Sequence, residues 1–215
     1  MNSVFTGQVR VGNPEGFSKA GCIPSQVTPR LSNIFVMGDE WPIYETTLSD
    51  NLGTNIANVF KPHGGPIYIW QTVPGFGGPF LQTQVEAAGV AYEEGLDLPA
   101  NLNEYCGIMV IDGGGPQTAA AIQPLQNYLL NGGNIAMFFG YGGSITLNPI
   151  LEMAGLYAPG GLDGIGTTIS VSSQDQYLVG VPSLIWNLGN IIQRLSDASK
   201  TLLDYGGQDI VFSCP

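Results

Sequence analysis

Positive charge is scarce in this chain of 215 residues. Six residues are lysine or arginine and 17 are aspartate or glutamate, which gives a formal net charge of -11. Nucleic-acid binding depends on clustered cationic side chains that neutralise phosphates, so the sequence excludes this class of function. Attraction to an anionic membrane surface is disfavoured for the same reason.

Long apolar runs are also missing. No run approaches the roughly 20 residues that a membrane-spanning helix needs, so we expect no membrane insertion. The first residues, MNSVFTGQVRVGNPEG, have neither the basic nor the apolar region of a signal peptide, although a removed leader or another export route stays open. Charged residues make up 11% of the chain, so the surface must be polar but largely uncharged. Such surfaces are common in secreted and assembled proteins, and we expect an extracellular or cell-surface location, with a cytoplasmic one as the alternative.

Cysteine and histidine are too few for most metal centres. Cys22, Cys106 and Cys214 are too far apart in sequence for a zinc motif. Cys106 stands at the entry to an apolar run and is expected to be a buried free thiol. Cys22 and Cys214 lie in terminal segments and would pair if those segments meet. His63 is the single histidine, which rules out a multi-histidine site; it is expected to be a solvated side chain, with a catalytic role as the alternative.

The most informative stretch is residues 105–143. Gly107 to Asp112 is a short apolar run, Ala119 to Leu130 has helical spacing, and Asn134 to Phe139 is a second apolar run. Asn131, Gly132 and Gly133 stop the helix. Two apolar strands joined by a helix predict a parallel sheet that is buried on both faces.

The same alternation continues on both sides of this stretch. Further strands are predicted at 33–37, 67–70, 90–92, 167–171 and 209–213, and further helices at 51–60, 80–88 and 149–154. Residues 198–204 are predicted to be a short helix or loop. The pattern predicts an α/β fold with a doubly wound, mostly parallel sheet that forms a single domain over residues 33–215.

Residues 1–32 are predicted to form an N-terminal arm. Val4 to Val11 alternates between apolar and polar residues, as a half-buried β-strand does. This strand would join the edge of its own sheet, which is the simpler expectation, or that of a neighbouring subunit. The second alternative would make the protein a homo-oligomer.

Candidate site residues follow three of the predicted strands. The loops that begin at Gly38, Asp112 and Gly140 should share the carboxyl edge of a parallel sheet, where such folds bind ligands. The carboxylates, aromatic rings and exposed backbone there make a candidate ligand-binding set: Asp39, Glu40, Trp41, Asp112, Gly113, Gly114, Tyr141 and Ser144. The three carboxylates could hold a divalent cation, and we expect no other cofactor. The alternative is that each aspartate only caps its own turn.

Nucleotide motifs are absent from this set. A dinucleotide fingerprint needs G-x-G-x-x-G at the start of a helix, whereas Gly113, Gly114 and Gly115 are contiguous and Pro116 follows them. The P-loop motif does not occur.

The stretch from Asn33 to about Leu156 resembles the class I glutamine amidotransferase-like superfamily, including ThuA-like domains. The similarity is carried by Gly38-Asp39, by the 107–112 strand with its glycines, and by the LLNGGNI segment at 129–135. Together with Asn55-Ile56-Ala57 and the LVGV segment at 178–181, these residues are similar to a group of uncharacterised exported bacterial proteins. The resemblance implies a flavodoxin-like or amidotransferase-like fold.

The catalytic residues of that superfamily are not found in this chain. The resemblance would place a nucleophilic cysteine in the turn from Gly140 to Ser144, but glycine stands at that position and no histidine follows. We therefore assign no catalytic residue.

Two functions remain as expectations. The first is a non-catalytic binding or structural module that is exported, contacts protein or glycan, and self-assembles through its arm. The alternative is a hydrolase or sugar-modifying enzyme that uses Asp39, Glu40 and Asp112, with or without a divalent metal. A third option is a small-ligand carrier in which Trp41 and Tyr141 form a stacking platform.

Overall fold

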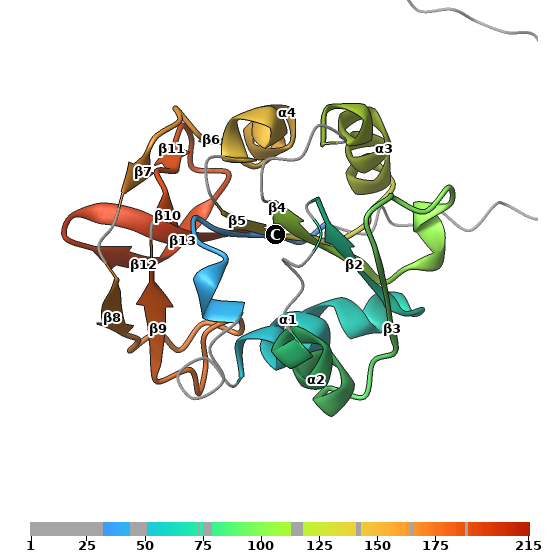
Figure 1. The fold of residues 1–215 in the computed structure, drawn as a ribbon, viewed down its shortest axis with the longest axis horizontal. Helices are drawn as coiled ribbons and strands as arrows, with labels where there is room; N and C mark the ends of the chain where they lie inside the picture. Colours follow the sequence, from blue (N-terminus) through green and yellow to red (C-terminus); the bar gives the residue numbers. More distant parts are fainter. Residues whose placement is uncertain are drawn as a thin grey trace, which may run out of the picture.

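A computed structural model describes residues 32–43, 51–72, 74, 79–112, 118–140, 143–163, 166–187 and 189–215. Residues 1–31 of the predicted N-terminal arm lie outside these residues. The centre of the fold is a seven-stranded sheet in the order β12-β13-β1-β5-β4-β2-β3 (Figure 1). Its strands are β1 (Ile34–Met37), β2 (Ile67–Gln71), β3 (Tyr92–Gly95), β4 (Gly107–Asp112), β5 (Ile135–Phe139), β12 (Lys200–Tyr205) and β13 (Gln208–Cys214).

Five neighbouring strands of this sheet are parallel, as the apolar runs predict. β1 pairs with β5, β5 with β4, β4 with β2, and β2 with β3, all in parallel. β13 pairs antiparallel with both β1 and β12. The sheet is therefore mostly parallel, with an antiparallel hairpin added at one side.

The order of the parallel strands is consistent with a flavodoxin-like arrangement. In the order 2-1-3-4-5 of that arrangement, β2 to β5 take the places of the first four strands, and β1 takes the place of the fifth. The chain must therefore cross β5 and β4 on its way from β1 to β2. As a result, β1 lies between β5 and the C-terminal hairpin.

Helices cover both faces of the sheet, which is what buried parallel strands require. α1 (Leu52–Phe60) and α2 (Pro79–Ala87) lie on one face, and α3 (Thr118–Leu130) and α4 (Asn148–Leu151) lie on the other (Figure 1). Short 3-10 turns join them: η1 (Trp41–Ile43), η2 (Lys61–His63), η3 (Leu102–Glu104), η4 (Gly143–Leu147) and η5 (Glu152–Ala154). None of the helices in the described part of the chain is long and apolar enough to span a membrane.

The core consists of two layers that the sheet separates. Phe35 and Met37 of β1 contribute to the cluster under α1 and α2. Ile34 and Val36 contribute to the cluster under α3 and α4. All four are buried, and the same alternation holds on β2, β4 and β5 because successive side chains of a strand point to opposite faces.

Two predictions about the strands need correction, and a third is confirmed as a strand. Residues 198–204 are not a helix or loop: β12 pairs with β13 in a hairpin whose turn uses Gly206 and Gly207, both with positive φ. β3 begins and ends later than predicted, because its paired residues include the exposed Glu93 and Glu94 at the sheet edge. The predicted strand at 167–171 forms β8 (Thr167–Ser170), but it pairs outside the main sheet.

Small ladders complete the C-terminal part of the fold. β8 pairs with β9 (Ser183–Trp186). The other two ladders join β7 (Leu162–Asp163) to β10 (Gly189–Asn190) and β6 (Leu156–Tyr157) to β11 (Gln193–Arg194). These segments lie beside the β1, β13 and β12 side of the sheet (Figure 1).

Candidate functional site

The carboxyl ends of β1, β5 and β4 meet at one edge of the sheet, as the sequence predicts. Gly38 follows β1, Gly140 follows β5, and Asp112 ends β4 opposite Phe139. Of the predicted site residues, Asp39, Glu40 and Trp41 are described there with their side chains. Gly113, Gly114 and Tyr141, and the side chains of Asp112 and Ser144, lie outside the described residues.

Asp39 is completely buried and holds two parts of the chain together. Its Oδ1 accepts a hydrogen bond from the backbone N–H of Trp41 at 3.1 Å. Its Oδ2 accepts one from the backbone N–H of Asn187, which follows β9. The first contact is the turn cap that the sequence left open as an alternative. The second ties the end of β1 to the C-terminal ladders.

Glu40 lies against the end of β5. A methyl group added at Gly140 would come within 2.5 Å of the Glu40 Cδ atom, so glycine makes room for the carboxyl. The Glu40 side chain is 7% exposed, and its Oε2 atom has no hydrogen-bond partner within the described residues. Trp41, next along the chain, is 37% exposed.

The two carboxyls are neighbours in the chain, and each affects the pKa of the other. Burial raises the pKa of Asp39 to about 6. The hydrogen bonds that Asp39 accepts from the backbone lower its pKa, but burial has the larger effect. Burial raises the pKa of Glu40 to about 7, and the neighbouring charge of Asp39 acts in the same direction. Near neutral pH the pair therefore shares a proton, because two adjacent buried carboxylates repel each other.

The other reactive side chains lie far from this edge. Cys106 directly precedes β4, at the amino edge of the sheet, and is completely buried, as predicted. Burial raises its pKa to about 11, so it is a thiol rather than a thiolate. His63 belongs to η2, before β2, at the same amino edge. Within the described residues, no group of three or more His, Cys, Asp or Glu side chains is placed to hold a metal ion.

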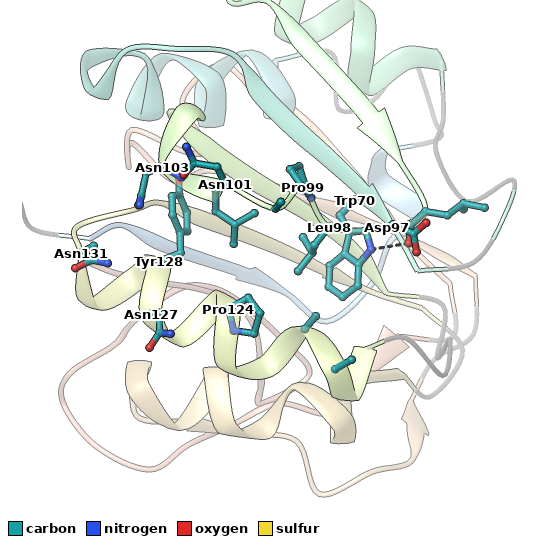
Figure 2. A pocket seen from close by; sticks show the side chains of 15 residues that line it. Trp70, Asp97, Leu98, Pro99, Asn101, Asn103, Pro124, Asn127, Tyr128 and Asn131 are labelled. Atoms are coloured by element: carbon teal, nitrogen blue, oxygen red, sulfur yellow. Dashed lines mark hydrogen bonds between the residues drawn. The ribbon is translucent and has the colours of Figure 1, made fainter.

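A second candidate site, which the sequence did not predict, is a groove of about 580 Å³ beside α3. Residues 96–103, which connect β3 to η3 and β4, form one wall, and α3 forms the other (Figure 2). We call it the α3 groove.

Asparagine side chains line the rim of the α3 groove. Asn101 and Asn103 extend from one wall, and Asn127 and Asn131 from the other (Figure 2). All four are exposed. The side chains of Asn103 and Asn131 make no hydrogen bond within the part of the chain that the structure describes. Asp97 is the one charged residue among those that line the groove.

The floor of the α3 groove is apolar and rigid. Trp70 is 1% exposed, and its Nε1 donates a hydrogen bond to the carbonyl oxygen of Leu96 at 2.9 Å. Tyr128 is 4% exposed, and its hydroxyl donates to the carbonyl oxygen of Tyr105 at 3.1 Å. These bonds fix both aromatic rings beneath the groove, so the accessible apolar surface comes from smaller side chains above them.

Two prolines contribute to that accessible surface. Pro99 is half-buried in one wall, and Pro124 is exposed on α3 (Figure 2). Because proline has no N–H, Pro124 leaves the carbonyl group of Ala120 without its helical donor, and Ala120 also lines the groove. The groove thus combines amide groups, a main-chain acceptor and a short apolar strip.

Comparisons of the chain with protein-family models, with curated proteins and with solved structures found no match.

Proposed function

We propose that this protein is a non-catalytic binding module whose α3 groove takes a neutral, hydroxyl-rich ligand such as a glycan chain. One observation carries the proposal: four exposed asparagine side chains gather at one end of the groove, next to an apolar strip that includes Pro99 and Pro124 (Figure 2). Each asparagine amide both donates and accepts hydrogen bonds, which suits adjacent hydroxyl groups. The apolar strip suits the C–H faces of sugar rings.

The charge of the groove supports a neutral ligand over a charged one. Its lining contains no lysine or arginine, so a phosphate or carboxylate ligand would meet no cation there. Asp97 is a single exposed carboxylate, which is too little to hold a cationic ligand firmly.

The same proposal covers the scaffold and its location. We propose an amidotransferase-like or ThuA-like scaffold without its catalytic triad, used outside the cell or at its surface. The motifs of the 33–156 segment and the mostly parallel sheet support the scaffold. The low fraction of charged residues, 11%, supports the location.

The test is a binding measurement with a panel of neutral oligosaccharides built from glucose, mannose, galactose and N-acetylglucosamine. We expect at least one to bind, and Asn127→Leu and Asn131→Leu each to weaken that binding by about 2- to 12-fold, the cost of losing one neutral hydrogen bond. Asn58→Leu is the matched control, because Asn58 is an exposed helix asparagine on α1, on the opposite face of the sheet.

Two results would remove the proposal. One is that no neutral oligosaccharide in the panel binds at millimolar concentration. The other is that the α3 variants and the Asn58 control bind equally well.

The proton-sharing pair at Asp39 and Glu40 favours a rival function, an enzyme that breaks or modifies sugar bonds with or without a divalent cation. The same panel separates the two functions. New reducing ends that appear with the wild-type protein and disappear in Glu40→Gln would establish the enzyme. A rise in Tm with Ca²⁺, Mg²⁺ or Mn²⁺ would support a metal in that site.

A further inference from the structure

A polar groove runs along the amino edge of the sheet. Two adjoining hollows of about 330 Å³ and 510 Å³ both include Asn33 and Gln176 in their lining. The Asn55 side chain donates hydrogen bonds to the carbonyl oxygens of Tyr177 and Val179 at 3.1 Å and 2.8 Å. These bonds hold α1 against the opposite wall, so the groove is a fixed feature. We call it the N-edge groove.

Cys214 lies in this groove, beside the start of the described chain. It is the last residue of β13 and stands opposite Ile34 in the ladder with β1. Its side chain is half-buried and carries a free thiol in the structure. Asn33 lines the same hollow, and its backbone N–H donates to the Asn134 side chain at 3.1 Å. The chain that precedes Asn33 therefore leaves the sheet next to Cys214.

The charges of the arm and of the rest of the chain are complementary. Residues 1–31 contain three of the six basic residues, Arg10, Lys19 and Arg30, and a single acidic residue, Glu15. Residues 32–215 hold the other three basic residues and 16 of the 17 acidic ones. A basic segment tethered to an acidic body is attracted to it, and the effective concentration is high because the two are covalently linked.

We propose that the N-terminal arm docks in the N-edge groove of its own chain, where a disulfide between Cys22 and Cys214 holds it. Ser32 lies ten positions after Cys22, and an extended chain of that length reaches about 33–36 Å. The Cα atoms of a disulfide are only about 4.4–6.8 Å apart, so the segment has ample length to turn back. Pro24 and Pro29, which lie within this segment, are suited to that turn.

The bond forms by thiol–disulfide exchange with an oxidant that is itself a disulfide. One cysteine sulfur attacks the oxidant and releases one thiol, and the second cysteine then displaces the other. Both cysteines lose their S–H protons and two electrons in total, and the oxidant becomes two thiols. The third cysteine, Cys106, takes no part because it is completely buried.

The test uses the full chain in a buffer of oxidised and reduced glutathione, followed by alkylation under denaturing conditions and peptide mass spectrometry. We expect a peptide pair linked through Cys22 and Cys214, a monomer on a non-reducing gel, and Cys106 as the one alkylated cysteine. Reduction of the wild-type protein, or Cys214→Ser, should lower Tm by roughly 5–15 °C.

Trypsin provides a readout of docking that does not depend on the mass of the linked peptide. Cleavage after Lys19 and Arg30 should be at least about tenfold slower in the oxidised wild-type protein than in Cys214→Ser, because a docked segment must open before a protease can cut it.

Three alkylated cysteines in the wild-type protein would overturn the proposal. A disulfide-linked dimer would overturn docking on the same chain and would point instead to exchange of the arm between copies. Equal cleavage rates with the disulfide formed would show that the segment is tethered but not docked, which also overturns the proposal.

Discussion

Asp39 and Glu40 are neighbouring carboxyls that are both buried, so even one negative charge there is unfavourable. Each pKa is raised mainly because burial removes water from around the carboxyl, and the pair can keep only one charge at moderate cost. A hydrogen bond that Asp39 accepts also joins the end of β1 to Asn187. The protonation state of two neighbouring residues therefore affects how firmly the C-terminal ladders are attached.

This pair should make the protein less stable as pH rises. The folded-state pKa values, about 6 and about 7, lie above the ordinary values of 3.8 and 4.5. The native state therefore binds protons more tightly than the unfolded chain, and the resulting stability is lost as pH rises through the folded-state values. We expect the free energy of unfolding from urea titrations to fall between about pH 4 and pH 7, the range between the ordinary and the folded-state values.

Glu40→Gln should remove most of that slope, because the amide is neutral at every pH. At pH 8 the variant should be more stable than wild type by roughly 1–3 kcal/mol. Glu86→Gln is the control for the general effect of removing one negative charge, because Glu86 is exposed on α2. An unchanged slope in Glu40→Gln would mean that the pair does not control the pH dependence.

At the scale of elements, one asparagine joins three strands at the amino edge of the sheet. Asn134 directly precedes β5 and is completely buried. Its Oδ1 accepts from the backbone N–H and the Nδ2 of Asn33, before β1, and its Nδ2 donates to the carbonyl oxygen of Cys106, before β4. A single side chain thus sets the starting register of β1, β5 and β4.

Asn134→Ala should cost about 2–4 kcal/mol of unfolding free energy, because it leaves the buried carbonyl group of Cys106 and the half-buried N–H of Asn33 without this partner. Urea denaturation at fixed pH measures this, with Asn58→Ala as the control; the control should stay within about 0.5 kcal/mol of wild type. A loss below about 1 kcal/mol for Asn134→Ala would show that water replaces the side chain at this edge.

The sequence predicts the elements that are buried on both faces and misses those that depend on distant partners. The run from Gly107 to Asp112 is apolar at almost every position because both faces of β4 are covered, and its bounds are confirmed. β12 has a mixed sequence, and only its pairing with β13 makes it a strand. The order of the strands cannot be predicted from local patterns, because β1 pairs with β5 and β13.

The two candidate sites also depend on contacts between distant parts of the chain, which local sequence patterns do not predict. The sequence places Asp39 and Glu40 at the carboxyl edge, but their burial depends partly on Asn187, far along the chain. The α3 groove has a weak local signal, with Asn127 near the end of α3 and Asn131 four residues later, directly after the helix. Its other wall, residues 96–103, is a mostly irregular segment that runs into η3, and its position against α3 is a property of the fold.

At the scale of the whole molecule, the most stable part should be the middle of the parallel sheet. β5 and β4 each have a partner strand on both sides and helices over both faces. β3 and β12 are the two edge strands of this sheet, and their outer backbone groups have no partner strand in it.

Hydrogen exchange followed by mass spectrometry should reproduce this order. Amides of β4 and β5 should exchange at the rate set by global unfolding, and amides of β3 and β12 at least about tenfold faster, through local opening. Peptides of β2 serve as an internal reference for these exchange rates, because β2 is apolar and pairs with the edge strand β3. Equal protection of β3 and β5 would indicate that an additional segment covers that edge.

The place of β1 in the sheet has a consequence for biosynthesis. Residues 34–37 are translated early, yet their partner strands begin at Ile135 and Gln208. During translation, β1 cannot pair with β5 and β13 until most of the domain has been synthesised. Such long-range pairing is slow, and apolar strands that wait for a partner are prone to aggregate. The order of synthesis therefore favours aggregation of the unfinished chain.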